Sequence, residues 1–561
     1  MQKFISIADF NQKGGWVTDS QFIEIMGTPY LLAHGLGTPV ADAVGAVELD
    51  EAGTYHVYAY TYNWNAPWKP EFTPGIFEVT VGGYKKVFGD QGEAWGWQDG
   101  GEFSFEKGTQ TLILHDLTGY EGRLGALLIT NEEPKAIREY FPAPAEVTAS
   151  YDYIVVGGGI TGITAAVSAA RSGLKTALVQ DRPVLGGNNS SEVRVWLSGK
   201  YCFDRFPKLG NITAELEQKV RDIFGMANQA SNYEDEKKLG LVTREENITL
   251  YLSHSVVEAE MEGDQIQSIV ALDVEKCVCI RLQAPLYADC SGDGVLAAYA
   301  GADYEVTTSG HMELSNFWCV ENTGVEQTFA PCPWAIDLTE PDFPGRLRAK
   351  GNNPEGEKEW ERKLGCWSWG AGFEHHPILK AEYARDTNFR AMYGAWDAIK
   401  NVDGDYKNYR IAYSSFIAGK RESRRFLGPV ILTTRDMLHK TVFDDAIIGI
   451  DWHLDVHTPN RKYYRAFVEG DAFYCSDGPT RWEVPYYMPY RCMYSRNISN
   501  LFFAGRNVSA THDGLGPVRV MRTCGMMGEA IGKAAWLCKE YGLTPDGVYQ
   551  QKLEELLDCF R

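Results

Sequence analysis

A glycine-rich turn after residues 151–156 has the residue types and spacing that bind a dinucleotide. The apolar run 151–156 predicts a β-strand, and the small residues that follow the turn predict a helix. Gly157, Gly159 and Gly162 form a G-x-G-x-x-G pattern. The first glycine permits the turn, the second lets the backbone approach a pyrophosphate, and the third lets helix and strand pack closely. The helix N-terminus would offer free N–H groups to the phosphates.

The ribose-binding position differs from the usual pattern. A second predicted strand, 176–179, ends at Gln180 and Asp181, about 20 residues after the glycines, where a carboxylate normally binds the ribose. Gln180 occupies the usual carboxylate position and Asp181 follows it. An amide also hydrogen-bonds a hydroxyl, so either residue would hold the ribose.

Three further segments carry a family resemblance. Residues 180–192 (QDRPVLGGNNSSE), 287–294 (YADCSGDG) and 500–507 (NLFFAGRN), the last followed by His512 and by 519–523, occur in this order along the chain. Together with the glycine turn, they resemble FAD-dependent oxidoreductases of the glutathione-reductase-like superfamily. Three motifs in order are far more specific than one glycine turn.

The resemblance implies FAD as the cofactor. It also implies an α/β fold: an FAD-binding Rossmann-like domain with an inserted substrate domain. The final helix would direct its N-terminus at the flavin, with Arg519 and Arg522 at the pyrimidine edge. The residues expected to bind the cofactor are Gly157, Gly159, Gly162, Gln180, Asp181, Arg182, Gly186, Gly187, Asn188, Ser191, Val257, Asp289, Gly292, Asp293, Gly505, Arg506, Arg519 and Arg522.

Three histidines are candidates for a catalytic base. A flavin accepts a hydride at N5, and oxidation of an alcohol also needs a base near the hydroxyl. A histidine suits this role because its unperturbed pKa is about 6.5. His512 is the first choice, because its segment is expected beside the isoalloxazine. His453 and His457 are the alternatives, and each of them is also compatible with a packed, hydrogen-bonded histidine.

The segment 419–425 (GKRESRR) contains two further candidates, Arg421 and Arg424. The resembling family has a Gly-x-Arg-x-x-Arg-like stretch near the flavin or substrate, where cations would stabilise an anionic reduced flavin. A solvated, ion-paired helix is the alternative interpretation of this basic cluster.

Neither the histidines nor the cysteines predict a metal site. His375 and His376 are adjacent and cannot easily share one ion. The twelve cysteines include no C-x-x-C pair. Cys277 and Cys279 alternate along a predicted strand, which leaves a redox dithiol open, while most of the cysteines are expected to be buried and reduced.

Composition limits the class of partner. The formal net charge is −21, which argues against nucleic-acid binding. No run of about 18 apolar residues predicts a membrane span. Residues 1–9 lack the apolar stretch of a secretory signal, which predicts a cytoplasmic protein, or a periplasmic one if a signal peptide has been removed.

Residues 1–147 predict a different kind of module. Short β-rich runs at 56–62, 76–81, 84–88, 111–115 and 126–130 are separated by turn residues. They predict an all-β jelly-roll sandwich, which resembles the carbohydrate-binding-like sandwiches of polysaccharide-degrading enzymes. Its tryptophans would stack on sugars if exposed, or fill the core or a domain interface: Trp16, Trp64, Trp68, Trp95 and Trp97.

The expected organisation is a sandwich (1–147), a first FAD-binding part (151–303), a substrate or cap region (304–499) and a closing FAD-binding segment (500–561). The expected reaction is oxidation of a carbohydrate or glycoside hydroxyl to a ketone, by hydride transfer to flavin N5, with the electron acceptor unknown. One alternative is a flavin-dependent reductase of an activated C=C bond, with an arginine as proton donor. Another is a glycan-binding protein with a catalytically silent flavin fold.

Overall fold

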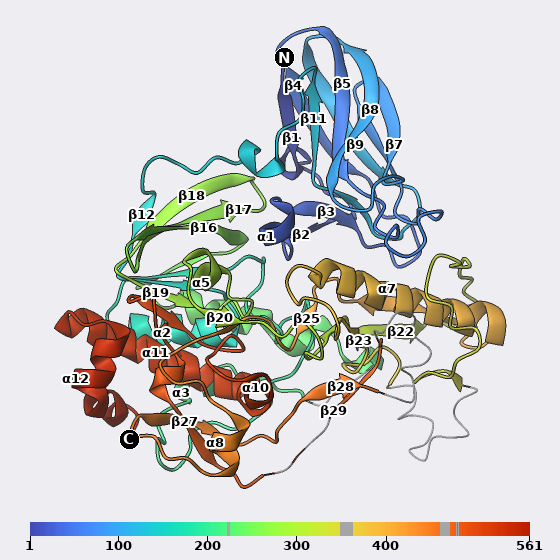
Figure 1. Ribbon diagram of the computed structural model, residues 1–561. Helices are drawn as coiled ribbons and strands as arrows, with labels where there is room; N and C mark the ends of the chain where they lie inside the picture. Colours follow the sequence, from blue (N-terminus) through green and yellow to red (C-terminus); the bar gives the residue numbers. More distant parts are fainter. Residues whose placement is uncertain (222–224, 348–362, 461–471, 478–479, 481) are drawn as a thin grey trace.

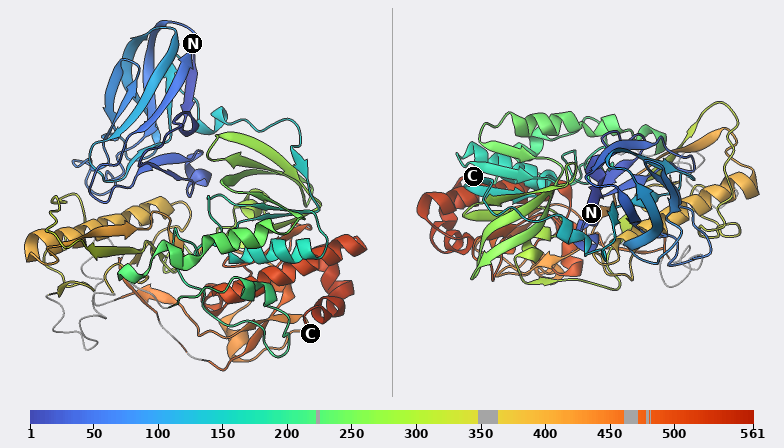
Figure 2. Two further views of the ribbon diagram at one scale, coloured as in Figure 1. Left: turned by 180° about the vertical axis from the view of Figure 1, so that it is seen from behind. Right: turned by 90° about the horizontal axis from the view of Figure 1, so that it is seen from above.

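A computed structural model describes residues 1–221, 225–347, 363–460, 472–477, 480 and 482–561 (Figure 1). In both side views the N-terminal β-sandwich projects from the top of the molecule, and the long helix α7 (Ala381–Asp397) lies beneath it (Figures 1 and 2). None of the helices among the described residues has the length and apolar character needed to cross a membrane.

Eight strands form the N-terminal sandwich. They are β1 (Lys3–Ser6), β4 (Ala43–Leu49), β5 (Gly53–Thr61), β6 (Phe77–Val81), β7 (Tyr84–Phe88), β8 (Gly96–Phe105), β9 (Gly108–Asp116) and β11 (Ala126–Thr130). The sheets are ordered β1-β11-β5-β8 and β4-β9-β6-β7. Renumbered from one to eight along the chain, these orders are 1-8-3-6 and 2-7-4-5, which is the jelly-roll arrangement. The predicted jelly roll is therefore confirmed.

A smaller sheet lies below the sandwich and faces the rest of the molecule. It contains β2 (Val17–Asp19), β3 (Tyr30–Ala33) and β10 (Gly122–Leu124), and the short helix α1 (Ile23–Met26) lies between β2 and β3. In Figure 1 these elements lie between the sandwich and α7 (Ala381–Asp397).

A five-stranded parallel sheet forms the α/β part of the molecule. Its order is β15-β14-β13-β19-β31. The bounds are β13 (Tyr153–Val156), β14 (Thr176–Val179), β15 (Ile248–Tyr251), β19 (Leu286–Asp289) and β31 (Leu501–Phe503). β13, β14, β19 and β31 are buried throughout, as expected for strands covered on both faces. The predicted Rossmann-like sheet is confirmed.

Two helices pack closely against each other beside this sheet: α2 (Ile160–Arg171) and α11 (Met521–Tyr541). A Cβ on Gly528 of α11 would lie 2.2 Å from the Thr161 carbonyl oxygen, and one on Gly532 would lie 2.5 Å from that of Ala165. Small residues in α11 therefore allow the two backbones to approach. This contact connects the first and last thirds of the chain.

A second sheet contains β12 (Ala149–Ser150), β18 (Val278–Gln283), β17 (Gln265–Asp273) and β16 (His254–Glu262) in that order. Cys277 lies before β18 with φ of +54°, and Cys279 lies within the strand. The prediction that both alternate along one strand was therefore wrong, because the chain is still turning at Cys277.

The region between β19 and β31 contains the long helix α7 and several small sheets. Its strands are β20 (Tyr304–Glu305), β21 (Leu314–Ser315), β22 (Trp318–Asn322), β23 (Gly370–Ala371), β24 (Tyr409–Ser414), β25 (Gly419–Lys420), β26 (Arg425–Phe426), β27 (Ala446–Ile450), β28 (His457–Pro459), β29 (Cys475–Asp477) and β30 (Tyr486–Pro489). The helices α5 (Val295–Tyr299) and α8 (Thr434–Leu438) also lie within this region. The other α-helices outside it are α3 (Asn211–Glu215), α4 (Asp235–Thr243), α10 (His512–Val518) and α12 (Pro545–Asp558).

The sandwich tryptophans make protein contacts. Trp16 is in the sandwich core, and Trp64 packs edge to face on Trp334, with ring centroids 5.5 Å apart. Trp68 stacks on Tyr383 of α7. The indole N–H groups of Trp95 and Trp97 donate to Glu382 Oε2 and to the Lys135 carbonyl. These contacts support the interpretation that the tryptophans fill the core and the domain interface.

Candidate functional site

The three glycines of the first turn meet different neighbours at the carboxyl end of β13. Gly157 has φ of +101°, and a Cβ there would lie 2.5 Å from the main chain of Cys290. A Cβ on Gly162 would lie 1.7 Å from the Gly157 carbonyl oxygen. At Gly159 the nearest atom is Gly187 Cα at 3.9 Å, so the space beside this residue is open. The turn thus has the close packing and the free space that the pattern predicts.

A cleft of about 170 Å³ lies beside this turn. The N-terminus of α2 faces it without a capping side chain, so its N–H groups are available to an anion. Twelve of the residues predicted to bind the cofactor line the cleft: Gly157, Gly159, Gln180, Asp181, Arg182, Gly186, Gly187, Asn188, Gly292, Asp293, Gly505 and Arg506.

Gln180 connects two turns of this cleft. Its Oε1 accepts a hydrogen bond from Gly158 N at 2.6 Å, and its Nε2 donates to the Val184 carbonyl at 3.1 Å. The amide is therefore used within the protein, while the Asp181 side chain is 40% exposed. Of the two candidates, Asp181 has the carboxylate available for a ribose hydroxyl.

The cleft contains an ion-paired carboxylate. Asp293 lies 2.5 Å from Lys420 Nζ and 2.5 Å from an Arg506 guanidinium nitrogen. Burial acts to raise the pKa of Asp293, but these two cations outweigh it and hold that pKa well below its usual value. Arg506 Nε is buried without a hydrogen-bond partner in the described part of the chain. An unpaired buried donor beside a glycine turn and a helix N-terminus suits an anionic dinucleotide.

Four of the predicted cofactor residues hold the surrounding structure together and do not line this cleft. Gly162 provides close packing, as described above. The Asp289 carboxylate accepts from the backbone N–H groups of Ser291 and Ala297, both at 2.9 Å. Ser191 N donates to Asp235 at 3.2 Å, and the Arg522 guanidinium donates to Glu217 at 2.7 Å.

Val257 also lies outside the cleft. Its side chain is in a hydrophobic cluster with Val270 and Phe141, whereas Val256 lines a neighbouring cavity. Successive side chains of a strand point to opposite faces, so the expected contact is displaced by one residue.

A second cavity of about 340 Å³ adjoins the first and shares Asn188, Lys420 and Met521 with it. Met521 is the first residue of α11, so the N-terminus of this helix lies where the two cavities meet, as predicted for the helix that faces the flavin. Aromatic and charged side chains line the second cavity: Trp196, Phe317, Trp367, Trp452, Arg421, His453, Asp455, His457 and Arg519.

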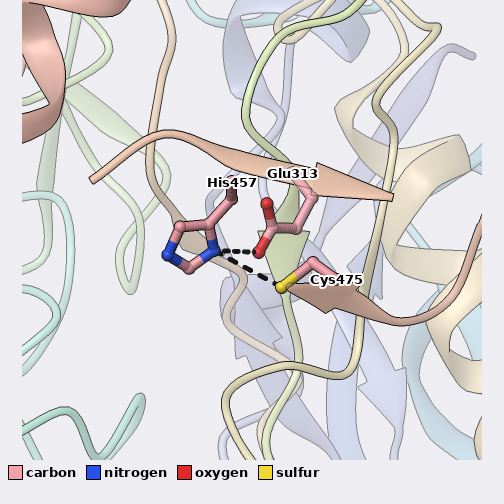
Figure 3. Close-up of side chains that lie close together, drawn as sticks. All are labelled: Glu313, His457 and Cys475. Carbon is pink, nitrogen blue, oxygen red and sulfur yellow. Dashed lines mark hydrogen bonds and ion pairs between the residues drawn. The ribbon is translucent and has the colours of Figure 1, made fainter. Parts of the chain in front are cut away.

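His457 lies between two carboxylates. Its Nδ1 lies 2.9 Å from Glu313 Oε1 (Figure 3). Its Nε2 lies 3.1 Å from Asp455 Oδ1. Burial acts to raise the pKa of Glu313, but Arg421 and His457 together hold it well below its usual value. Both ring nitrogens of His457 therefore lie beside carboxylate oxygens of the protein.

Glu313, His457 and Cys475 could also be considered as metal ligands, because their donor atoms lie within 4.8 Å of one another. However, the Arg421 guanidinium already lies 3.1 Å from Glu313 Oε1, which places a competing cation at the carboxylate. Burial and then the Glu313 carboxylate raise the pKa of the Cys475 thiol well above its usual value, so it stays protonated. We interpret the cluster as a hydrogen-bonded network that orients His457.

His453 has a different environment from His457. Its ring stacks on Trp452, with ring centroids 4.9 Å apart. Its Nε2 is buried and has no hydrogen-bond partner among the described residues, and the nearest carboxylate oxygen, Asp455 Oδ1, is 3.8 Å away. His453 therefore combines a side chain that lines the second cavity with a ring nitrogen that no described residue bonds.

The remaining catalytic candidates are divided between the cavity and its surroundings. Arg421 lines the second cavity and donates to Ser315 Oγ at 2.6 Å and to the Trp367 carbonyl at 2.7 Å. His512 is outside both cavities, and its Nδ1 lies 2.7 Å from Glu422 Oε2. Arg424 donates to the Asp293 carbonyl at 3.1 Å and pairs with Glu24. The structure thus separates His512 and Arg424 from the second cavity.

Several site residues were not predicted. Lys420 precedes Arg421, and Asp455 lies two residues from His453 and from His457, so the sequence neighbourhood of these two residues was a usable signal. Trp367 lies 54 residues before Arg421 and has no predicted site residue beside it. Glu313 and Gln21 lie far from every motif in sequence, and only the fold brings them to the site.

Parts of this chain are similar to known proteins. Over 89 residues the chain is 48% identical to pseudooxynicotine dehydrogenase from Pseudomonas sp, a match that spans 15% of this chain and 18% of that relative's length. The Mycobacterium smegmatis Sdh1 complex in the apo form is 12% identical, with 70% of this chain and 69% of that chain covered and a TM-score of 0.33. The L-proline dehydrogenase from P. horikoshii is 15% identical, with coverages of 89% and 71% and a TM-score of 0.28.

The two structural likenesses are distant, whereas a family model matches most of the chain. The model described as FAD dependent oxidoreductase matches residues 152–557, which include the glycine turn, the second cavity, α11 and the lining of the first cavity apart from Gln21. The chain therefore belongs to the FAD dependent oxidoreductase family, with FAD as its cofactor.

Proposed function

We propose that this enzyme oxidises a hydroxyl group of a carbohydrate or glycoside to a ketone, with His453 as the base. The observation that carries the proposal is that His453 lines the cavity that meets the N-terminus of α11, while its Nε2 has no hydrogen-bond partner among the described residues. This replaces His512, the first candidate, because His512 is outside that cavity and paired with Glu422.

The lining of the cavity suits a sugar. Indole rings offer flat apolar faces to the C–H groups of a sugar, and the cavity contains Trp367 and Trp452. Ser198, Asn228 and Arg194 on the same lining offer groups that hydrogen-bond hydroxyls. A cavity with both kinds of group fixes the orientation of a polyol while excluding much of the water.

The proposed oxidation needs a hydride acceptor, a base and a group that stabilises negative charge. Bound FAD supplies the acceptor for the hydride that leaves the carbinol carbon. His453 Nε2 takes the hydroxyl proton, so the C–O bond becomes a carbonyl as the C–H bond breaks. Positive charge on Arg519, which lines the cavity, stabilises the negative charge that develops on the oxygen. Asp455 lies 3.3 Å from the Arg519 guanidinium and holds it in position.

The C=C reductase alternative would use Arg421 as the proton donor. Its guanidinium already bonds Ser315, the Trp367 carbonyl and Glu313. These contacts favour a role in holding the cavity wall, so the oxidation is the better-supported proposal.

To test this, the purified FAD protein is mixed anaerobically with a panel of glycosides and polyols, and the visible absorption band of the flavin is recorded. One sugar should bleach the band. With that sugar, His453→Gln should slow bleaching by about 10²- to 10⁴-fold, the usual contribution of a general base, and should remove the pH dependence of the rate. His512→Ala is the matched control and should stay within a few-fold of the wild type.

Two outcomes would overturn the proposal. Bleaching that is unaffected by His453→Gln would remove His453 as the base. If no sugar or polyol bleaches the flavin band of the yellow protein, the substrate is not a carbohydrate or glycoside. The C=C reductase would then be the better-supported function.

A further inference from the structure

A cleft of about 80 Å³ connects the N-terminal module to the cofactor site. Residues 20–25 form one side of it, and residues 254–256 form another. Gly157, Asp181 and Asp293 line both this cleft and the cofactor cleft described above. Gln21 also lines both. A segment of the jelly-roll module therefore reaches the family's cofactor site.

The position of this cleft identifies the part of FAD beside it. The pyrophosphate belongs at the glycine turn and the N-terminus of α2, and the ribose at Asp181 after β14. The cleft lies beyond Asp181, beside residues 254–256 at the start of β16. Met521 at the N-terminus of α11 does not line it, and among the described residues it shares only Lys420 with the second cavity. It is therefore on the adenosine side of the cofactor site.

We propose that residues 20–25 of the jelly-roll module form a wall over the adenosine half of FAD and that cofactor binding stabilises the contact between the module and the α/β part. The inference rests on the FAD site and is independent of the proposed substrate.

Direct contacts fasten this wall to the cleft. Ser20 Oγ donates to the Asp181 carbonyl at 3.1 Å, which holds the backbone of the ribose-binding candidate. Gln21 Oε1 accepts from Ala418 N at 2.7 Å, and its Nε2 donates to the Phe416 carbonyl at 3.0 Å. Ala418 itself lines the cofactor cleft. Gln21 is thus a positioning residue that holds another cleft wall in place.

An ion pair fastens the wall at a second point. Glu24 of α1 pairs with Arg424, whose guanidinium donates to the Asp293 carbonyl at 3.1 Å. The Asp293 carboxylate in turn pairs with Arg506 in the cofactor cleft. This explains why Arg424 is buried although it does not reach the second cavity.

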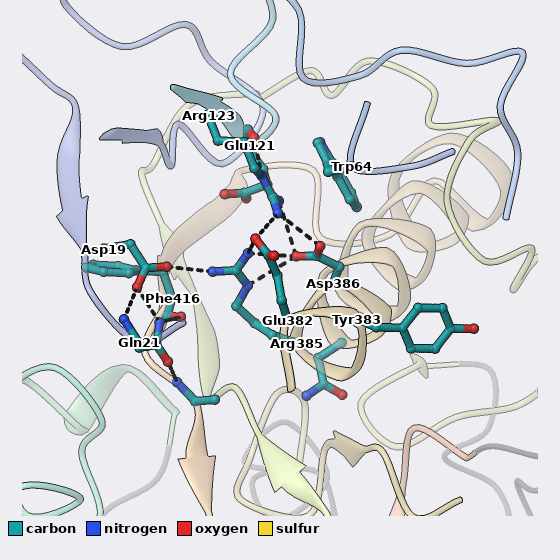
Figure 4. Close-up of polar contacts among 12 residues, drawn as sticks. Asp19, Gln21, Trp64, Glu121, Arg123, Glu382, Tyr383, Arg385, Asp386 and Phe416 are labelled. Carbon is teal, nitrogen blue, oxygen red and sulfur yellow. Dashed lines mark hydrogen bonds and ion pairs between the residues drawn. The ribbon is translucent and has the colours of Figure 1, made fainter. Parts of the chain in front are cut away.

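The same segment is anchored on its other side (Figure 4). Asp19 accepts from Gln21 Nε2 at 2.9 Å and from Arg385 of α7 at 2.7 Å. Arg385 also donates to the hydroxyl of Tyr30 on β3. The wall is therefore bonded to the α/β part on one side and to α7 on the other, so its position is set before any ligand arrives.

The first test uses hydrogen exchange of the full-length FAD-free protein with ADP or FAD added. ADP carries the adenosine and the two phosphates without the isoalloxazine. Either ligand should slow exchange in residues 17–26 as well as in α2. The β6–β7 hairpin, residues 77–88 at a distant part of the sandwich, should not change. Protection of α2 without protection of residues 17–26 would overturn the proposal, and so would a lack of protection in both.

The second test measures affinity. Gln21→Ala removes three hydrogen bonds at the wall and should weaken ADP and FAD binding by about tenfold, as expected for the loss of one to two net hydrogen bonds. Gln12→Ala, at an exposed position of the same module, is the control and should bind as the wild type does.

If Gln21 had only a structural role, Gln21→Ala would impair folding of the FAD-free protein. Circular dichroism and the thermal midpoint of the FAD-free variant measure this without the ligand. Ser20→Ala, which removes one hydrogen bond to the Asp181 carbonyl, is the milder second variant and should weaken ADP binding by a few-fold. If both variants fold and bind ADP with wild-type affinity, residues 20–25 do not form a wall over the adenosine half of FAD.

Discussion

At the scale of single residues, Gly159 and Gly162 allow cofactor binding to be separated from folding. A Cβ at Gly159 would meet only Gly187 Cα at 3.9 Å, so alanine fits the FAD-free protein. The same Cβ would occupy the open space where the pyrophosphate approaches the backbone. Gly159→Ala should therefore leave the thermal midpoint of the FAD-free protein unchanged and weaken FAD binding by at least about tenfold, measured by flavin fluorescence titration.

Gly162→Ala is the matched variant with the opposite expectation. Its Cβ would lie 1.7 Å from the Gly157 carbonyl oxygen, so α2 must move away from the turn. We expect a loss of about 1–3 kcal/mol in the free energy of unfolding of the FAD-free protein, together with weaker FAD binding. Equal stability of the two variants would contradict this assignment of roles.

The histidines show how far residue types alone can predict a site. His453 and His457 are four residues apart and were equivalent candidates in the sequence. Their roles differ because Glu313, 144 residues before His457, reaches the ring of His457 and not that of His453. Such a partner leaves no local signal. Short-range patterns identified the candidate residues, and contacts distant in sequence decide between them.

At the scale of elements, helix α7 is joined by buried charges to the smaller sheet of β2, β3 and β10 (Figure 4). Arg385 is fully buried and contacts Asp19, Tyr30 and Asp386. Arg123 of β10 contacts Glu382 at 2.7 Å and Asp386 at 3.1 Å. Each buried carboxylate therefore has a guanidinium partner from another element, which fixes how the two elements meet.

This network predicts a large effect for one substitution. Arg385→Met leaves Asp19 and Asp386 buried without their main cation and should cost about 3–5 kcal/mol in the free energy of unfolding, measured by urea titration. Arg410→Met is the control, because Arg410 is 62% exposed and its pair with Glu321 should contribute about 0–1 kcal/mol. A loss for Arg385→Met as small as that of the control would show that the network does not hold the interface.

Elements differed in how well the sequence predicted them. The alternating apolar pattern of β5 and the glycine turn after β13 are local signals, and both elements occur as predicted. The role of α7 was not foreseen, because its buried face is charged: Arg385, Asp386 and Arg390 are all buried. Burial of charges depends on partners from the smaller sheet, which lie hundreds of residues away in the sequence.

At the scale of the whole molecule, the FAD site joins segments from the entire chain. The cofactor cleft contains Gln21 from the N-terminal module, Lys420 from the central region and Cys524 from α11. The fold class and the cofactor were predicted from motifs, because the ends of parallel strands meet at one edge of the sheet. The contribution of Gln21 requires the docking of a separate module, which no motif in that module encodes.

The cofactor site also makes stability depend on pH. Burial acts to raise the pKa of Asp293, but Lys420 and Arg506 hold it well below its usual value in the folded protein. A depressed folded-state pKa stabilises the protein above the unfolded value, about 3.9 for aspartate, and this contribution is lost as the pH falls below it. Asp293 should therefore stabilise the FAD-free protein fully at pH 7 and progressively less below about pH 4.

Asp293→Asn tests this linkage, because an amide keeps the size of the side chain and removes its charge. At pH 7 the variant should be less stable than the wild type by on the order of 2 kcal/mol, measured by urea unfolding without FAD. The difference should shrink as the pH falls from 5 towards 3, because the wild-type carboxylate then gains a proton in the unfolded state. Asp50→Asn, at an exposed position of the sandwich, is the control and should show a small difference at every pH. A difference for Asp293→Asn that stays constant across this range would mean that packing, and not its ion pairs with Lys420 and Arg506, accounts for the contribution of Asp293.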